Sequence, residues 1–164
     1  MNKKILVAYF TKGGASREYA QAVADTITEN GCLVELCNLA DDIPDITAFN
    51  TIILGTGVRM SMVYRRWNKI LKQKELRNKY LYLFLSSGMA YEEPEKAVEK
   101  FLHPLVKKYG LNPISMVSFP GKIPERWAKL DNQKEKMKLD LAKEWAQKIA
   151  KERKKINNHS MNLI

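Results

Sequence analysis

The sequence is poor in the residues that mark fibrous, disordered or disulfide-stapled chains. Its 164 residues include 8 glycines, 6 prolines and 2 cysteines. That is too little glycine and proline for a collagen-like or disordered chain. A chain of this length can bury a core of its own without disulfides or metals. We therefore expect one globular domain, at most with a tail.

Long apolar runs are also missing. No apolar stretch approaches the ~18 residues of a membrane span. The basic start and the short run Ile5–Phe10 lead into Thr11 and a glycine pair, with no small-residue cleavage site. This start predicts the buried first strand of a cytoplasmic protein.

The two cysteines do not fit a disulfide or a zinc site. Cys32 and Cys37 lie five residues apart in what looks like one strand, hence on opposite faces and about 17 Å apart. A disulfide needs Cα atoms within about 7 Å, and no further Cys or His lies nearby as a zinc ligand. We expect both thiols to be free and reduced, and no metal site.

Acidic residues are scarce relative to basic ones. The 28 Lys and Arg outnumber the 18 Asp and Glu, which gives a net charge of +10, and residues 120–164 hold 12 of the basic and 6 of the acidic residues. Such charge bears on partners rather than on fold. The basic C-terminal helix is either solvated or docks on an acidic protein or anionic lipid. Nucleic-acid binding is not expected, because no recognition motif or aromatic platform accompanies the charge.

Apolar runs alternate with amphipathic helical patterns along the chain. One helical stripe, for example, contains Trp67, Ile70 and Leu71. This alternation predicts an α/β fold with a five-stranded parallel sheet and helices on both faces, with ligands at the carboxyl ends of the strands. The expected strands are residues 5–10, 32–36, 51–54, 80–85 and 114–119, the expected helices are 16–30, one from about 63, 94–110 and one from about 133, and 157–164 is expected to fray.

The loop after the first expected strand has the composition of an anion site. It reads Thr11-Lys12-Gly13-Gly14-Ala15-Ser16, with two hydroxyls and two glycines ahead of a helix. Glycines let backbone N–H groups approach an anion, and a helix start directs its positive end at it. The alternative is an ordinary glycine turn with Ser16 as helix N-cap. The P-loop motif of nucleotide triphosphatases and the glycine fingerprint of dinucleotide-binding folds are both absent.

These features resemble the flavodoxin family. The phosphate loop of that family is matched at Thr11, Gly14 and Ser16, and the chain departs from it at Gly13, where the family usually has threonine. The resemblance covers about residues 4–150 and implies a flavodoxin-like three-layer sandwich with strand order 2-1-3-4-5. It assigns residues 1–155 to one FMN-binding domain and 156–164 to a C-terminal tail.

Three further motifs resemble the branch of the family that contains the quinone-dependent protoporphyrinogen oxidases. They are Gly55-Thr56-Gly57-Val58-Arg59 after the third strand, Gly121-Lys122-Ile123 after the fifth, and Trp145-Ala146-Gln147-Lys148-Ile149-Ala150 in the last helix. The chain departs from this branch at residues 124–140, a short and mostly charged segment. The branch has a longer, partly apolar segment there that contacts membrane and quinone.

FMN is the cofactor that the resemblance implies, with its phosphate in the loop from Thr11 to Ser16. The other implied contacts are Thr56, Gly57, Val58 and Arg59 along one side of the flavin, Ser86, Ser87, Gly88 and Met89 at its pyrimidine end, and Tyr91. The Tyr91 ring either stacks on the flavin or packs on the helix that begins at Pro94. Because the flavin supplies the redox chemistry, we expect no catalytic side chain, and we expect His103 and His159 to be structural or solvated.

Two functions fit this resemblance. The first is an electron carrier of the flavodoxin type, whose basic charge suits an acidic redox partner protein. The second is an FMN-dependent oxidoreductase that passes electrons to a quinone, with protoporphyrinogen as the acidic small-molecule substrate. Arg59 would then face the substrate carboxylates; the alternative is a solvated helix start with Arg65 and Arg66. Peripheral membrane contact would rest on Trp127 and its basic neighbours, and the charged segment around it argues against such contact.

Overall fold

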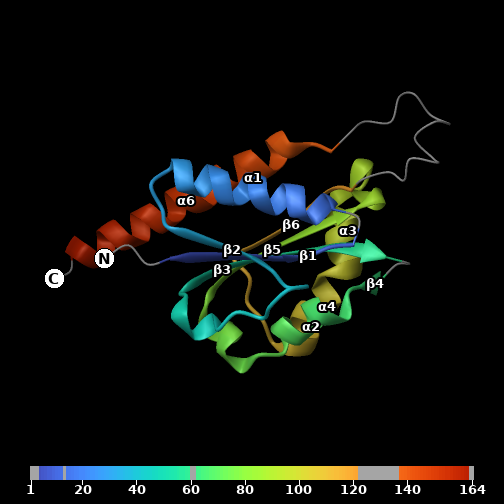
Figure 1. The fold of residues 1–164 in the computed structure, drawn as a ribbon, viewed down its shortest axis with the longest axis horizontal. Helices are drawn as coiled ribbons and strands as arrows, with labels where there is room; N and C mark the ends of the chain where they lie inside the picture. Colours follow the sequence, from blue (N-terminus) through green and yellow to red (C-terminus); the bar gives the residue numbers. More distant parts are fainter. Residues whose placement is uncertain (1–3, 13, 60–61, 122–136, 163–164) are drawn as a thin grey trace.

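A parallel sheet lies between two layers of helices (Figure 1). The computed structural model describes residues 4–12, 14–59, 62–121 and 137–162. The sheet order is β2-β1-β3-β5-β6, and β4 pairs antiparallel with β3 outside this row. Counted along the chain without β4, this is the order 2-1-3-4-5, so the expected fold is confirmed. The strands are β1 (Ile5–Phe10), β2 (Val34–Asn38), β3 (Thr51–Arg59), β4 (Met62–Val63), β5 (Tyr80–Ser87) and β6 (Ser115–Pro120).

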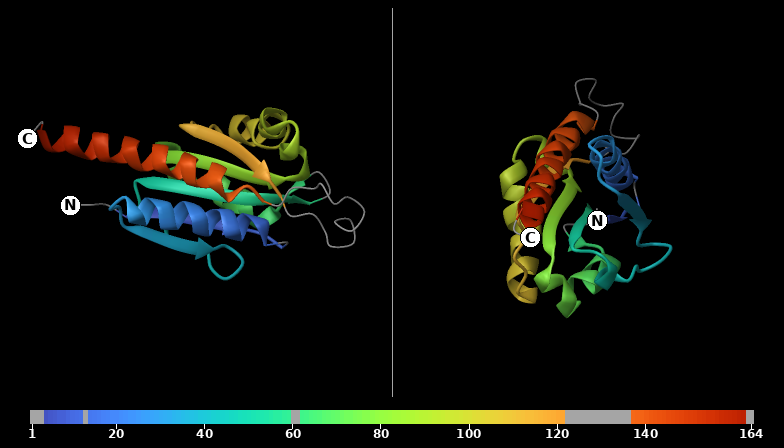
Figure 2. Two further views of the ribbon diagram at one scale, coloured as in Figure 1. Left: turned by 90° about the horizontal axis from the view of Figure 1, so that it is seen from above. Right: turned by 90° about the vertical axis from the view of Figure 1, so that its left-hand side faces the viewer.

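Helices cover both faces of the sheet, as expected (Figures 1 and 2). One layer contains α1 (Ala15–Glu29) and α6 (Leu139–Asn162), and the other contains α2 (Arg65–Leu71), α3 (Pro94–Phe101) and α4 (His103–Tyr109). Short 3-10 helices, η1 (Ile46–Ala48), η2 (Lys74–Asn78) and η3 (Gly88–Tyr91), lie in the connections. Figure 2 shows α6 running back beside α1 and past the amino ends of the strands. Within the described ranges, no helix has the length and apolarity that crossing a membrane requires.

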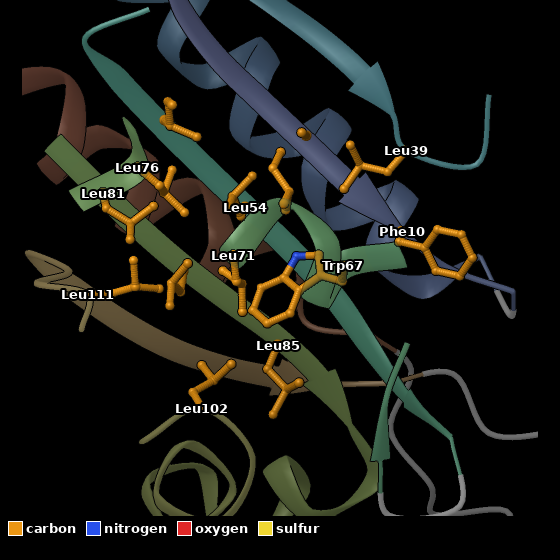
Figure 3. Packing of buried hydrophobic residues seen from close by; sticks show 14 of the residues in the cluster. Phe10, Leu39, Leu54, Trp67, Leu71, Leu76, Leu81, Leu85, Leu102 and Leu111 are labelled. Atoms are coloured by element: carbon orange, nitrogen blue, oxygen red, sulfur yellow. The ribbon is translucent and has the colours of Figure 1, made fainter. Parts of the chain in front are cut away.

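The central strands are buried on both faces, which explains their continuous apolar sequences. In β1, Leu6 and Ala8 join the core on the side of α2, while Val7 and Tyr9 join the core under α1 and α6. Figure 3 shows the indole of Trp67 in the middle of the core on the side of α2, and the side chain is fully buried. The helical stripe predicted around Trp67 is therefore confirmed.

Strand β3 is longer than expected, and the prediction that it ends before Gly55 is wrong. It pairs with β1 and β5 beyond that point, with Gly57 opposite Ser86. A Cβ at Gly55 would lie 1.8 Å from the ring of Phe84, so this glycine makes room for a core ring. The neighbouring strand β5 likewise continues to Ser87.

The expected single helix over residues 94–110 is two helices. α3 ends at Phe101, and α4 starts at His103 and contains Pro104 in its first turn. Proline has no backbone N–H and its ring crowds the preceding turn, so a continuous helix cannot pass through it without a kink. Gly110 ends α4 in the left-handed conformation, with φ 63°, as expected.

The bounds of several other elements also differ from the expectation. β2 begins at Val34, so Cys32 precedes the strand that was expected to contain both cysteines; both thiols are free. β6 begins one residue late, at Ser115. The last helix continues to Asn162, into the segment expected to fray. Its expected start near residue 133, together with Lys122, Ile123 and Trp127, lies outside the described residues.

Replacing Gly55 tests its role as space for Phe84. Gly55→Ala should lower the free energy of unfolding by about 1–3 kcal/mol, the typical cost of overpacking a buried site. Urea unfolding followed by circular dichroism measures this. Gly57→Ala is the matched control, since a Cβ there would meet its nearest heavy atoms at 3.6 Å. Equal losses in the two variants would contradict the packing argument.

Candidate functional site

The carboxyl ends of β1, β3, β5 and β6 meet at one edge of the sheet. Phe10 is level with Thr56, and Ser87 is level with Pro120. The loops after these strands therefore lie side by side, as the parallel topology predicts. Most of the residues that the sequence suggested for cofactor binding lie in these loops or in the helix and strand ends beside them.

The loop after β1 presents the start of α1. Gly14 adopts the left-handed conformation, with φ 87°, and its N–H donates to Thr11 Oγ1 at 3.0 Å. Gly14 is the N-cap residue, so the alternative of Ser16 as N-cap is wrong, and as a glycine it makes no side-chain bond to the first turn. The first amides of this 15-residue helix carry partial positive charge, which suits an anion such as phosphate. Lys12 is exposed beside them.

Three hydroxyls of the predicted site make hydrogen bonds inside the protein. Ser16 is fully buried, and its Oγ lies 2.8 Å from Ser86 Oγ in a hydrogen bond. The buried hydroxyl of Thr56 donates to the carbonyl of Gly57 at 3.0 Å. The contact between Ser16 and Ser86 fixes the start of α1 against the end of β5. Backbone amides and Lys12 are thus the main groups that this loop offers to an anion.

The end of β5 offers a polar group that lacks a partner. Ser87 is 7% exposed, and its Oγ has no hydrogen-bond partner among the described residues. A buried hydroxyl left in this state costs about 1–3 kcal/mol unless a ligand or water satisfies it. The next residue, Gly88, is exposed and has open space where a Cβ would stand. This segment suits close approach by a flat polar ligand.

The end of β6 is tied to the same edge by two tyrosines. Tyr91 donates its hydroxyl to the carbonyl of Gly121 at 2.8 Å, and the N–H of Gly121 donates to the carbonyl of Ser87 at 3.0 Å. The buried Tyr19 of α1 donates its hydroxyl to the carbonyl of Pro120. The Tyr19 oxygen also accepts the N–H of Lys138 at 3.2 Å. These bonds hold the segment from Ser87 to Tyr91 against β6.

The comparisons with known proteins decide the family. The sequence matches the family model of the flavodoxin domain over residues 6–139. The chain belongs to the flavodoxin family. A search of curated proteins finds no significant match.

Solved flavodoxins have the same fold as this flavodoxin-like chain. A flavodoxin from the domain Archaea is 16% identical, with a TM-score of 0.64 over 92% of this chain and 99% of that one. Oxidised Flavodoxin 1 from Bacillus cereus is 16% identical, with a TM-score of 0.65 over 90% and 97%. Rubredoxin oxygen:oxidoreductase from Desulfovibrio gigas is 20% identical, with a TM-score of 0.64 over 93% of this chain. The chain spans only 36% of that protein's length.

The structure brings most of the predicted flavodoxin ligands together. At this edge lie residues of the loop after β1, the start of α1, the strands β3 and β5, and η3: Thr11, Gly14, Ala15, Ser16, Thr56, Gly57, Ser86 to Met89 and Tyr91. Val58 and Met89 pack partly against the core. Gly13 and the side chain of Arg59 lie outside the described residues. Arg66 donates to the carbonyls of Leu39 and Ala40, each at 3.0 Å, so it ties α2 to the loop after β2.

Sequence reasoning missed the residues that position this flavodoxin site. Tyr19 was expected only as part of a core stripe, and Tyr64 was not considered. The Tyr64 ring lies 4.8 Å from the ring of Phe10 and 3.6 Å from the position of a Cβ on Gly57. Neither alternative for Tyr91 included its bond to Gly121. Among the described residues, no group of three or more His, Cys, Asp or Glu is placed to hold a metal ion.

Tyr19 should make stability sensitive to alkaline pH. Burial raises the pKa of Tyr19 from 10.0 to about 12. The unfolded chain loses this proton near pH 10 and the folded chain only near 12, so the stabilisation is complete below pH 10 and is lost as pH rises. Between pH 9 and 11 the free energy of unfolding should fall about 1 kcal/mol more in the wild type than in Tyr19→Phe. Urea titrations at both pH values measure this, and parallel curves would contradict the assignment.

Proposed function

We propose that this protein binds FMN at the carboxyl edge of its sheet and carries electrons through the flavin. The observation that carries the proposal is the joint presence of two ligand-ready groups at this edge. They are the start of α1 behind Gly14 and the buried hydroxyl of Ser87, which has no partner among the described residues and lies beside the open Gly88. Membership of the flavodoxin family supports FMN as the ligand. A Fusobacterium nucleatum flavodoxin variant bound to flavin mononucleotide, 17% identical, shares the fold with a TM-score of 0.51 over 71% of this chain and 68% of that one.

Different residues of this edge would bind the phosphate and the ring of FMN. The amides at the start of α1 and the Lys12 ammonium would hold the phosphate, which their positive charge favours. Ser87 and Gly88 would border the ring, where the hydroxyl of Ser87 gains the partner it lacks. FMN supplies one- and two-electron redox chemistry when bound. The bond between Ser16 and Ser86 keeps the phosphate loop and the ring segment in fixed register.

Electron transfer to an acidic partner protein fits the charge of the chain. The net charge of +10 favours encounter with a negatively charged partner and makes the encounter rate depend on salt. A carrier also needs no acid–base side chain at this edge, because the flavin supplies the redox chemistry. We place this activity in the cytoplasm as part of the proposal.

The second candidate is an FMN-dependent oxidoreductase of the protoporphyrinogen oxidase type with a quinone acceptor. It rests on the motif Gly55 to Arg59 and on a basic charge that suits an acidic substrate. No comparison with known proteins singles out that branch. Turnover of protoporphyrinogen with a quinone by the FMN-loaded protein would favour this candidate, and a carrier would only shuttle electrons from a reductase.

A substitution at Gly88 tests the proposed flavin site. Gly88→Val should leave the fold intact, because the structure has open space there, but its branched side chain should occupy the ring site. We expect at least a 10-fold weaker FMN affinity, corresponding to about 1.4 kcal/mol, in a titration of flavin fluorescence quenching. Ala48→Val is the matched control, since Ala48 is exposed in η1, ahead of β3. No FMN binding by the wild type, or equal binding by both variants, would refute the site.

A further inference from the structure

A chain of hydrogen bonds runs from the start of α6 to the end of β5. The N–H of Lys138, the residue before α6, donates to the Tyr19 oxygen at 3.2 Å, and the Tyr19 hydroxyl donates to the carbonyl of Pro120. The N–H of the next residue, Gly121, donates to the carbonyl of Ser87 at 3.0 Å. Each of these bonds is donated in the direction of Ser87, whose buried hydroxyl has no partner among the described residues.

One peptide group links the two halves of this chain of bonds. The carbonyl of Pro120 and the N–H of Gly121 belong to the same planar trans peptide unit, so they point in opposite directions. When the Tyr19 hydroxyl fixes the carbonyl, it therefore also fixes the direction of the N–H that bonds to Ser87. Hydrogen bonds in such a chain polarise one another, so that each bond strengthens the next.

Gly121 lies directly against the backbone of Ser87. A Cβ on Gly121 would be 3.4 Å from the backbone nitrogen of Ser87 and 3.5 Å from its Cα, so the missing side chain is what lets the two backbones meet. The hydroxyl of Tyr91 also holds Gly121, because it donates to the Gly121 carbonyl at 2.8 Å. The position of Ser87 thus depends on Gly121, and that of Gly121 on the hydroxyls of Tyr19 and Tyr91.

The same geometry directs a backbone donor towards the proposed ring site. Strand β5 lies between β3 and β6, and the carbonyl of Ser87 points to β6, where it accepts the N–H of Gly121. In the planar peptide unit between Ser87 and Gly88, the N–H of Gly88 points the opposite way, to the side of β3. Ser86, two residues before Gly88, is level with Gly57 of β3. The Gly88 N–H therefore faces the part of the edge where β3 and β5 meet.

The hydroxyl of Tyr19 is the feature that core packing leaves unexplained. The residue is fully buried, and its ring stacks on Phe119 with the ring centroids 4.8 Å apart. A phenylalanine would make the same ring contact and would bring no polar group that needs a partner. What the hydroxyl adds is the bond to Pro120, on the path that leads to the ring segment.

We propose that Tyr19 is a positioning residue for FMN. Through Pro120 and Gly121 it sets the position of the Ser87 hydroxyl and the Gly88 N–H at the edge of the flavin ring. Tyr19 belongs to α1, whose first amides would hold the phosphate, so one side chain links the phosphate end of the site to its ring end. The proposal rests on the proposed function, since it concerns the same site.

Removal of the Tyr19 hydroxyl tests this path without any flavin. In the FMN-free protein, Tyr19→Phe should lengthen the bond from Gly121 to Ser87, so the amide proton of Gly121 should move upfield in the NMR spectrum. Tyr82→Phe is the matched control, because Tyr82 is also a buried tyrosine and its hydroxyl bonds to Glu152 of α6, away from this edge. The Gly121 amide should not move in the control. An unchanged Gly121 amide in Tyr19→Phe would overturn the proposal.

The same two variants test the effect on FMN. Tyr19→Phe should weaken FMN binding about 3- to 10-fold, which is the contribution of one hydrogen bond to an equilibrium. It should also lower the midpoint potential of the bound flavin, because a misplaced N–H stabilises negative charge on the reduced ring less well. Tyr82→Phe should change neither quantity, although both variants lose a buried hydrogen bond and some stability.

The outcomes separate this proposal from the proposed function. A wild type that does not bind FMN would refute the proposed function and, with it, the role of Tyr19 towards FMN. A wild type that binds FMN, together with equal binding by Tyr19→Phe, would refute the positioning role alone. Equal losses in Tyr19→Phe and Tyr82→Phe would show a general effect of stability and would also overturn the positioning role.

A variant of Tyr91 separates positioning from ring stacking. Tyr91→Phe keeps the ring and removes the hydroxyl, so its FMN affinity should fall about as far as that of Tyr19→Phe. Both hydroxyls act on Gly121, so the double variant should lose less affinity than the product of the two separate factors. Full affinity in Tyr91→Phe, or losses that multiply independently, would overturn this shared action on Gly121.

Discussion

Strand β3 is the constraint on which the site depends, because it is buried between β1 and β5 and packed from both faces. The ring of Phe84 in β5 fills the space beside Gly55 in β3, which fixes how these two strands pack. Their register brings Thr56 and Gly57 to the edge where β1 and β5 end. The hydrogen bond between Ser16 and Ser86 joins the start of α1 to the end of β5 at this edge. The loops of the site are thereby held by rigid elements, which is the condition for a preorganised ligand site.

The layer architecture and the strand order could be predicted because they depend on repeated local patterns. Each central strand is an apolar run, and each covering helix shows a one-sided stripe. Parallel strands share a carboxyl edge, so the convergence of the loops followed from the topology alone. The end of β3 could not be predicted in this way, because glycine usually marks a turn. At Gly55 it makes room for Phe84, a residue 29 positions away, and no local pattern contains that contact.

The roles of individual polar side chains were harder to predict than their positions. Ser16 and Thr56 were expected to contact a cofactor, and the structure shows the hydroxyl of each in a hydrogen bond within the protein. Among the buried hydroxyls of the described residues, that of Ser87 is left without a partner. Which hydroxyl faces inward depends on tertiary packing. A local sequence pattern does not contain that information.

The last helix shows the same limit for charged residues. Its charge suggested a solvated surface, yet Arg153 is only 6% exposed and its guanidinium lies 4.1 Å from the centre of the Tyr80 ring. Beside it the hydroxyl of Tyr82 donates to Glu152 at 2.6 Å. Burial and this hydrogen bond hold the pKa of Tyr82 well above its ordinary value. These inward-facing groups fix α6 on the sheet, so that the rest of its basic residues remain on the surface.

The central claim is that FMN binds at the carboxyl edge of the sheet, with its phosphate at the start of α1. An NMR titration of the isotope-labelled chain with FMN tests this claim most directly. The account predicts that the largest amide shifts fall on residues 14–17 and 86–89, with little change in η1 and η2 at the far edge. Absent shifts, or shifts centred on the far edge, would contradict it.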